Sequence, residues 1–284
     1  MTFAKLILSG LLICTGIYLF VSAPQRLPDQ ADAQVTACRF EVVELFDAVN
    51  AINDAARGIY TRRIVGGGLK AGLKFGEDWT EPDVEKGPLP ALFLRLTASR
   101  LERRPQPLGL YLGSDAPINK SNLFSAVQAV AFEQVKSTRE PVFSQDDTAG
   151  SVGMYPDVAS VMPCVTCHND HPDSPRTDWK LDDMMGATTW TYPQSQVSAT
   201  DYMQTVDAML ASVREAYQAY LDKTQTFVRA VPIGADWPTE GNRTLPTVEV
   251  FLAEVRTAAA TAMIDSMYPP VRSGDRAGGL TCAK

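Results

Sequence analysis

Two cysteines and a histidine near the middle of the chain, Cys164, Cys167 and His168, follow the order Cys-x-x-Cys-His. In c-type haem proteins, two thiols at this spacing add to the vinyl groups of a haem and the adjacent imidazole coordinates the iron. The two intervening residues let both thioethers reach one porphyrin edge. The sequence therefore predicts one covalently bound haem c, carried by Cys164 and Cys167, with His168 as the proximal iron ligand.

Three other roles fit these cysteines less well. A thioredoxin-like dithiol usually lies in a βαβ unit, which the surrounding sequence does not indicate. A zinc site would have to draw on both cysteines, His168 and His171, and the adjacent Cys167 and His168 would be an awkward pair for one tetrahedral ion. A disulfide between Cys164 and Cys167 would close a small strained ring.

The run from Leu6 to Ala23 contains no charged residue and predicts a membrane segment. As a helix it would rise about 27 Å, close to the roughly 30 Å hydrocarbon thickness of a bilayer. We expect residues 1–23 to provide a single-pass anchor through residues 6–23, with the remainder on the periplasmic side of the cytoplasmic membrane. The alternative is a cleaved signal peptide, which would leave a soluble periplasmic protein.

Composition and charge narrow the class of function. The chain is 45% hydrophobic and 21% charged, which is typical of a folded protein. Its net charge of −7, without a dense Lys/Arg run, argues against nucleic-acid binding. Because neither a nucleophile–base pair nor a phosphate-binding loop is evident, we do not expect an enzyme.

Apolar residues at alternating four- and three-residue spacings follow a polar linker at 24–31 and predict a long helix from about Asp32 to Tyr60. Cys38 lies on the buried face of this predicted helix. The run Gly66-Gly67-Gly68 then predicts the end of regular structure. The stripe consists of Cys38, Val42, Leu45, Val49, Ile52, Ala56 and Ile59.

Beyond the glycines, short strands alternate with helices as far as Pro193, which predicts an α+β fold with an antiparallel sheet and flanking helices. Two helical stripes then predict a C-terminal hairpin that packs on the rest of the chain. We expect one domain at 32–193 and a helical extension at 194–284. The expected helices are 91–103, 122–136, 202–221 and 248–267, and the expected strands are 108–112, 142–144, 151–155 and 187–192.

The segment from Cys164 to Lys180, completed by Gly186, resembles the signature of the PAS-like c-type haem-binding domain family. The similarity runs through Cys-His-Asn-x-His-Pro-x-Ser-Pro and Asp-Trp-Lys, and with the preceding elements it covers about 32–193. The resemblance implies a PAS-like fold and either an exported single-domain protein or a sensory input. We therefore expect redox or ligand sensing, or a redox subunit of a larger complex, with an unknown protein partner in a signalling or redox membrane complex.

The resemblance also implies a second axial ligand from the N-terminal helix, which here can only be the Cys38 thiolate. Such a ligand would lower the reduction potential relative to a His/Met pair. From the residues alone, Cys38 is equally well explained as a buried apolar cysteine or as a disulfide partner of Cys282. An open, five-coordinate iron that binds a gas is a further alternative.

Other residues near the motif are expected to support the haem rather than to bind its iron. His171 follows His168 too closely to reach the opposite face, so we expect it to contact a propionate or the neighbouring backbone, with Trp179 and Lys180 beside it. Methionines more often fill cores than bind iron. The methionines concerned are Met154, Met162, Met184 and Met185.

Two positions depart from the family pattern. Members commonly carry a Gly-Asp pair and then a basic residue just before the glycine that corresponds to Gly186, whereas this chain has Asp182-Asp183 and Met185. The charge for a haem propionate would then have to come from a substitute. The candidate substitutes are Arg62, Arg63 and Lys180.

Two further function classes stay open on sequence grounds. One is a periplasmic electron-transfer cytochrome, and the other is a haem-dependent peroxidase.

Overall fold

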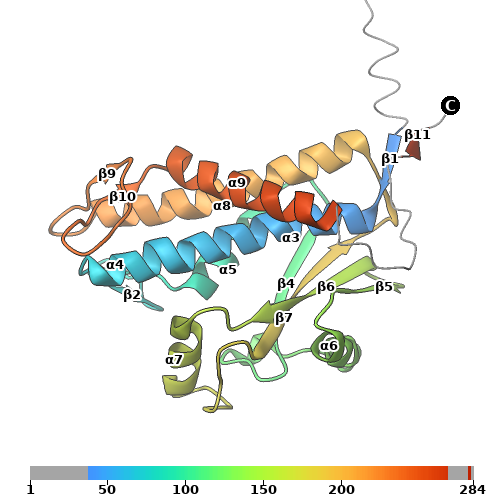
Figure 1. Ribbon diagram of the computed structural model, residues 1–284, viewed down its shortest axis with the longest axis horizontal. Helices are drawn as coiled ribbons and strands as arrows, with labels where there is room; N and C mark the ends of the chain where they lie inside the picture. The colour runs from blue at the N-terminus through green and yellow to red at the C-terminus, as the bar shows by residue number, and fades with distance from the viewer. Residues whose placement is uncertain (1–37, 268–280, 283–284) are drawn as a thin grey trace, which may run out of the picture.

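The computed structural model describes residues 38–267 and 281–282, in which long helices lie across one face of a small antiparallel sheet (Figure 1). The mixture of helices and antiparallel strands that the sequence predicts is confirmed. The helices are α3 (Val42–Ile59), α4 (Gly67–Lys70), α5 (Pro90–Leu101), α6 (Ala126–Thr138), α7 (Met162–Asp170), α8 (Ala199–Gln225) and α9 (Val248–Met267), with a π-helix η1 (Tyr60–Gly66) and a 3₁₀ turn η2 (Lys120–Asn122).

Four strands form the main sheet, in the order β4-β7-β6-β5, and every neighbouring pair is antiparallel. Helices α3 and α5 contact one face of this sheet, and α6 contacts the other. The pairing of β6 with β7 shifts register between Asp157 and Val158, just before the chain leaves the sheet for α7. These strands are β4 (Gly109–Gly113), β5 (Val142–Asp146), β6 (Gly150–Val158) and β7 (Met184–Tyr192).

Short strands complete the described fold. Two parallel pairs join β2 to β3 and β9 to β10, and a three-stranded sheet has the order β11-β1-β8. Their bounds are β1 (Cys38–Glu41), β2 (Phe75–Gly76), β3 (Gly87–Pro88), β8 (Gln196–Ser198), β9 (Ile233–Gly234), β10 (Leu245–Pro246) and β11 (Thr281–Cys282).

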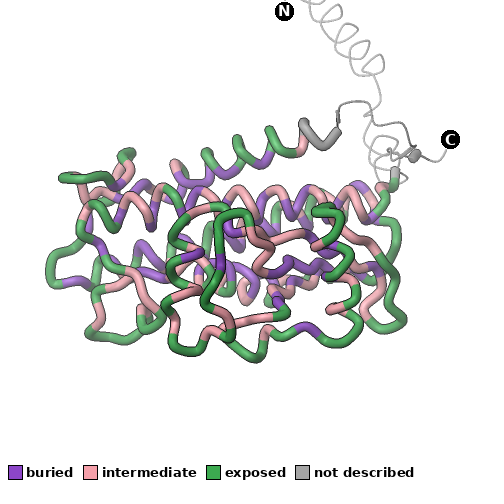
Figure 2. The backbone as a smooth tube through the Cα atoms, turned by 60° about the horizontal axis from the view of Figure 1, so that its bottom comes forward, coloured by how far each residue is buried: buried purple, intermediate pink, exposed green. Residues whose placement is uncertain are grey.

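Aromatic stacking joins the long helices into one core. The rings of Tyr60 and Phe93 stack with their centroids 4.2 Å apart, and those of Tyr217 and Phe251 do the same at 4.2 Å. All four side chains are fully buried. Buried positions therefore run along the facing sides of the helices (Figure 2), and α8 and α9 pack on the preceding helices as their apolar stripes predict.

A row of polar contacts fixes α3 against the sheet. The indole Nε1 of the buried Trp190 on β7 donates to Asn50 Oδ1 at 3.1 Å. On β6, the hydroxyl of Tyr155 donates to Asp47 Oδ1 at 2.5 Å. These α3 residues share one side of the helix, so a shift of α3 by one turn would leave polar groups without partners.

The N-terminal helix begins later than its apolar stripe predicts. Residues 38–41 form strand β1 between β8 and β11, and α3 begins only at Val42; residues 32–37 lie outside the described part of the chain. The prediction that Cys38 lies on a helix is therefore wrong. Backbone pairing of Phe40 with Val197, together with a stack of Phe40 on Tyr202 at 4.6 Å, holds these residues in an extended conformation.

The glycine run does not end regular structure, because the helical path continues from η1 into α4. These glycines allow close packing instead. A Cβ atom on Gly67 would lie 2.2 Å from the carbonyl oxygen of Pro238, and one on Gly68 would lie 2.9 Å from the ring of Phe75. The missing side chains therefore let the loop before α9 and strand β2 approach the helix.

The expected single-pass anchor must be corrected. No helix within residues 38–267 and 281–282 is both long enough and apolar enough to cross a membrane. The run at residues 6–23 lies outside the described residues. The alternative of a soluble periplasmic protein stays a prediction.

We expect Gly67→Ala to lower the free energy of unfolding by about 1–3 kcal/mol, because the added methyl group must displace backbone around Pro238. Urea denaturation measures the change. The matched control is Gly66→Ala, whose Cβ would meet its nearest atom at an ordinary 3.5 Å and which should be neutral or stabilising. Equal effects of the two substitutions would contradict the close-packing role of Gly67.

Candidate functional site

Helix α7 presents the two cysteines and the histidine on one side. The chain enters the helix from Val161 in an extended conformation, and Pro163 occupies the first turn, where no backbone N–H is needed for the helix ladder. At about 100° per residue, Cys164, Cys167 and His168 fall within a sector of roughly 100°. The local helix therefore gives these three side chains a common direction.

Both thiols are unpaired and protonated at neutral pH. Cys164 is half-buried, Cys167 is exposed, and neither forms a disulfide. Burial raises the pKa of each thiol; the Arg57 cation opposes this for Cys164, and Glu77 adds to it for Cys167. A disulfide oxidoreductase needs a thiol whose pKa is lowered, so these shifts argue against the dithiol alternative.

The imidazole of His168 carries an unused nitrogen in a buried position. Nδ1 is inaccessible to solvent and has no hydrogen-bond partner among the described residues. Burial lowers the pKa of His168, although Asp157 opposes the shift, so the ring is neutral at pH 7. A neutral imidazole is the form that binds a metal.

Trp179 lies edge-on to His168, with the ring centroids 6.1 Å apart and an interplanar angle of 84°. Asn169, the residue after the motif, holds this tryptophan against α7. Its Nδ2 donates to the Trp179 carbonyl at 3.0 Å, and its Oδ1 accepts from the Trp179 backbone N–H at 2.8 Å. The indole Nε1 is buried and lacks a partner in the described part of the chain, so a second donor is available beside the histidine.

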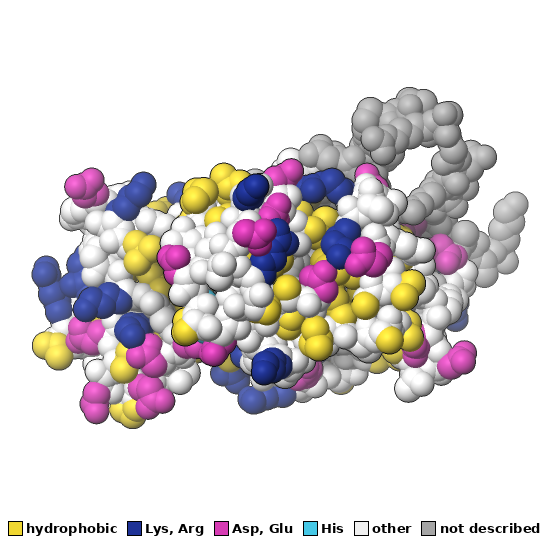
Figure 3. Space-filling view, turned by 90° about the horizontal axis from the view of Figure 1, so that it is seen from below, with side chains coloured by type: hydrophobic (Ala, Val, Ile, Leu, Met, Phe, Trp, Pro, Cys, Tyr) yellow, Lys and Arg dark blue, Asp and Glu magenta, His cyan; other side chains and the backbone are white. Residues whose placement is uncertain are grey.

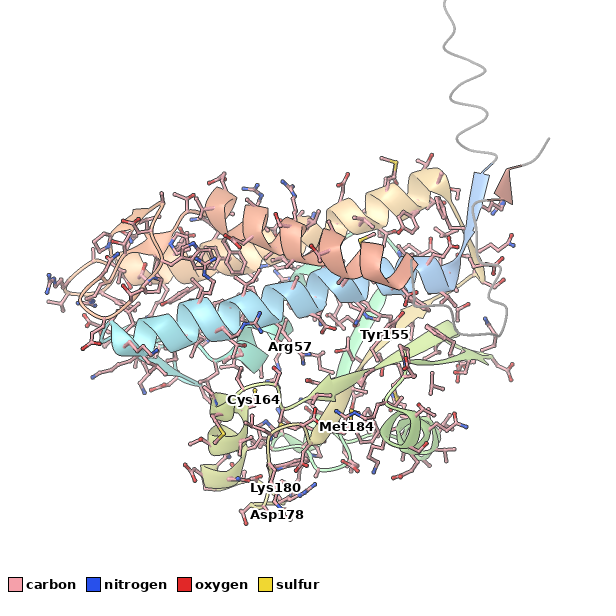
Figure 4. All side chains as sticks on the ribbon, viewed as in Figure 1. Arg57, Tyr155, Cys164, Asp178, Lys180 and Met184 are labelled. Atoms are coloured by element: carbon pink, nitrogen blue, oxygen red, sulfur yellow. The ribbon has the colours of Figure 1, made fainter. Side chains whose placement is uncertain are left out.

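An ion pair between α3 and β6 lies beside the motif. Arg57 binds Asp157 and also binds Asp54 at 3.1 Å. Burial alone would lower the pKa of Arg57, but the two carboxylates raise it above its ordinary value. Figure 4 shows Arg57 on the α3 side of Cys164, whereas Lys180 and Asp178 lie toward the opposite end of α7.

The basic residues named from the sequence are placed elsewhere. Arg63 lies 3.7 Å from the ring of Trp237 and pairs with Glu254 at 3.1 Å. Arg62 and Lys180 are exposed. The sequence did not point to Arg57 or to its partner Asp157. In a local pattern, an arginine at the polar edge of an amphipathic helix looks the same whether it binds a carboxylate or only water.

His171 makes the backbone contact expected of it. Its Nδ1 accepts from the Asp173 backbone N–H at 3.1 Å, and its Nε2 lies 3.4 Å from a Glu77 carboxylate oxygen. The described residues contain no group of three or more His, Cys, Asp or Glu side chains placed to hold a metal ion. The contacts that His171 makes are thus with Asp173 and Glu77.

Two of the four methionines lie away from the motif and two lie beside it. Met154 is buried and Met184 half-buried in the cluster beneath α6, and Met162 is exposed. Met185 packs against the small cluster of Ala159, Val165 and Trp179, where Cys164 also lies. Met162 lies on α7 itself, two residues before Cys164, but its side chain is exposed.

The structure does not bring Cys38 to the motif. Arg57, which influences the Cys164 thiol, is separated from the start of α3 at Val42 by about 22 Å of helix. Cys38 lies beyond that start, on a strand that pairs with β8 and β11. Because an axial ligand must touch the iron, this placement does not support Cys38 as the distal ligand.

The turn before β7 places Asp182 in an unusual backbone conformation. Asp182 has φ of 71°, in the left-handed region that favours glycine and that aspartate also tolerates. Hydrogen bonds between the backbone of Ala159 and that of Asp182 and Asp183, at 3.0 and 2.9 Å, hold this turn. An aspartate thus holds a turn conformation that glycine adopts more readily.

Basic and acidic side chains are interspersed on the lower face of the molecule (Figure 3). Arg176 has partners of both kinds, an aromatic ring and two carboxylates. Its guanidinium lies over Trp179 at 4.1 Å and binds Asp178 at 2.5 Å and Asp183 at 3.3 Å. The Arg176 cation beside Trp179 is therefore paired with two carboxylates.

We expect Asn169→Ala to lower the free energy of unfolding by about 1–3 kcal/mol, because two hydrogen bonds to the Trp179 backbone are lost. Urea unfolding followed by tryptophan fluorescence measures this loss. Asn169→Asp keeps the acceptor and removes the donor, so its effect should be intermediate. If both variants unfold like the wild type, Asn169 does not hold Trp179 in place.

Comparison with known proteins identifies a family. The model of the Tll0287-like family matches residues 30–193, which agrees with the extent expected from the signature. The function of that family is unknown, and the match assigns neither a haem nor a PAS-like fold. Searches of curated proteins and of solved structures each found no match. Because the match covers more than half of the 284 residues, this chain belongs to the Tll0287-like family.

Proposed function

We propose that this protein is an exported c-type haem protein that acts as a redox element, either sensing or passing electrons within a larger assembly. Cys164 and Cys167 would carry the haem as thioethers and His168 would bind its iron. One observation carries the proposal: two unpaired thiols and a neutral imidazole lie on the same side of α7. The Nδ1 atom of that imidazole is buried and lacks a partner among the described residues.

The neighbouring residues suit the rest of such a group. Trp179 offers an unused buried N–H, which is suited to a carboxylate of a haem propionate. The Arg57 cation also lies beside Cys164, but it is already bound to Asp157 and Asp54. When bound, the haem supplies one-electron chemistry, and the protein residues hold and orient it and keep water from the imidazole.

Electron transfer with a partner protein is the use favoured by one further observation. Cys167 is exposed while Cys164 and His168 are half-buried, so the edge attached at Cys167 would lie at the surface. A surface edge suits exchange of electrons with a partner. Sensing of a small ligand by the haem would be the alternative use.

We also propose that the fold is PAS-like. The antiparallel sheet with helices on both faces supports this assignment. The motif follows the strand whose pairing shifts register at Asp157, so the site lies at one end of the sheet.

The test is expression of the full chain in a bacterium that exports it and attaches haem c. We expect one haem to stay attached after denaturation, detected by haem staining and by intact mass. Cys164→Ser together with Cys167→Ser should abolish attachment, whereas Cys38→Ser should leave attachment and spectrum unchanged. A wild-type protein without covalent haem, or one that purifies with stoichiometric zinc, would overturn the proposal.

His168→Ala separates iron binding from covalent attachment. We expect the variant to retain its thioethers but to change its visible absorption spectrum, because the axial nitrogen is lost. His171→Ala is the matched control, since its ring contacts Asp173 and Glu77, and its spectrum should stay close to that of the wild type. The reverse result would assign the iron to His171.

A further inference from the structure

Cys38 and Cys282 lie directly opposite one another although they are near the two ends of the chain. Strand β1 pairs with β11 in antiparallel register, with Cys38 opposite Cys282 and Arg39 opposite Thr281. On its other edge β1 pairs with β8, and the Val42 backbone N–H donates to the Ser195 carbonyl at 2.9 Å. The middle strand is thus held in position by residues other than the cysteine pair.

This register satisfies the backbone requirement of a disulfide. Residues directly opposite in an antiparallel ladder have Cα atoms about 4.5–5.5 Å apart, and disulfides join Cα atoms about 4.4–6.8 Å apart. A slip of one residue would remove the match, because Arg39 or Thr281 would then face a cysteine. The pairing therefore places these two cysteines where the bond forms without moving the backbone.

We propose that Cys38 and Cys282 form a disulfide that closes the three-stranded sheet β11-β1-β8. The other cysteines have different locations: Cys164 and Cys167 lie on α7, and Cys14 lies within the apolar N-terminal run. In the reaction, both thiols lose a proton and an electron each, one S–S bond forms, and a disulfide-bearing oxidant is reduced to two thiols. This disulfide would form whether or not the protein binds a haem.

The bond would supply stability that β11 lacks. A two-residue strand makes too few hydrogen bonds to hold a chain end by itself. A cross-link between residues so distant in sequence removes much conformational freedom from the unfolded chain. It would also give Cys38 a role that requires no iron.

Peptide mapping tests the proposal directly. The full chain is exported by a bacterium, denatured, alkylated without reduction and digested with trypsin. We expect the peptide of residues 27–39 to be joined to that of residues 277–284, each containing one cysteine, and the joined mass to vanish on reduction. Protein made in a reducing cytosol should acquire the same link when incubated with oxidised glutathione.

Several results would overturn the proposed disulfide between Cys38 and Cys282. Alkylation of both cysteines in the exported protein, or a link from Cys38 to Cys14, would exclude the bond. A disulfide between two copies through Cys282, seen as a dimer on a non-reducing gel, would exclude it as well.

Variants supply an independent measurement. Cys282→Ser should expose one alkylatable thiol at Cys38 and lower the Tm by about 5–10 °C. The matched control is Thr281→Ser, which keeps both thiols and should keep the link and the Tm. An unchanged Tm in Cys282→Ser, with Cys38 already alkylatable in the wild type, would contradict the proposal.

Discussion

The hydrogen bond from Trp190 to Asn50 determines how the longest element of the N-terminal half crosses the sheet. Both groups are buried, so breaking the bond would leave polar atoms without water or partner, at about 1–3 kcal/mol each. Tyr155 and Asp157 extend the row of contacts along β6 to Asp47 and Arg57. Because apolar packing alone permits α3 to slide, this polar row specifies its position.

The site lies at one end of that row. The contact between Arg57 and Asp157 joins α3 to the last residues of β6, and α7 follows soon afterwards in the chain. The same two charges act on the Cys164 thiol, and Asp157 acts on His168. The interaction that positions the helix thus also sets the electrostatic surroundings of the motif.

Sequence periodicity located most of the elements. Helices α5, α8 and α9 and strands β4, β6 and β7 lie where the apolar patterns predict them, since each buries one face over several turns or residues. The prediction failed at Cys38, because a four-residue strand is too short for its period to differ visibly from that of the following helix. It failed at Gly67 because the glycine serves a contact with Pro238, far away in the sequence.

The sequence by itself determined the spacing of Cys164, Cys167 and His168, because that spacing is local and needs no fold to be read. The helix α7 that turns the three side chains to one side was not predicted from the sequence. Tertiary structure alone decided what surrounds them: it brought Arg57 to the motif and carried Cys38 away to face Cys282. The physical reason is that strand pairing and helix packing join residues more than a hundred positions apart, which no local pattern records.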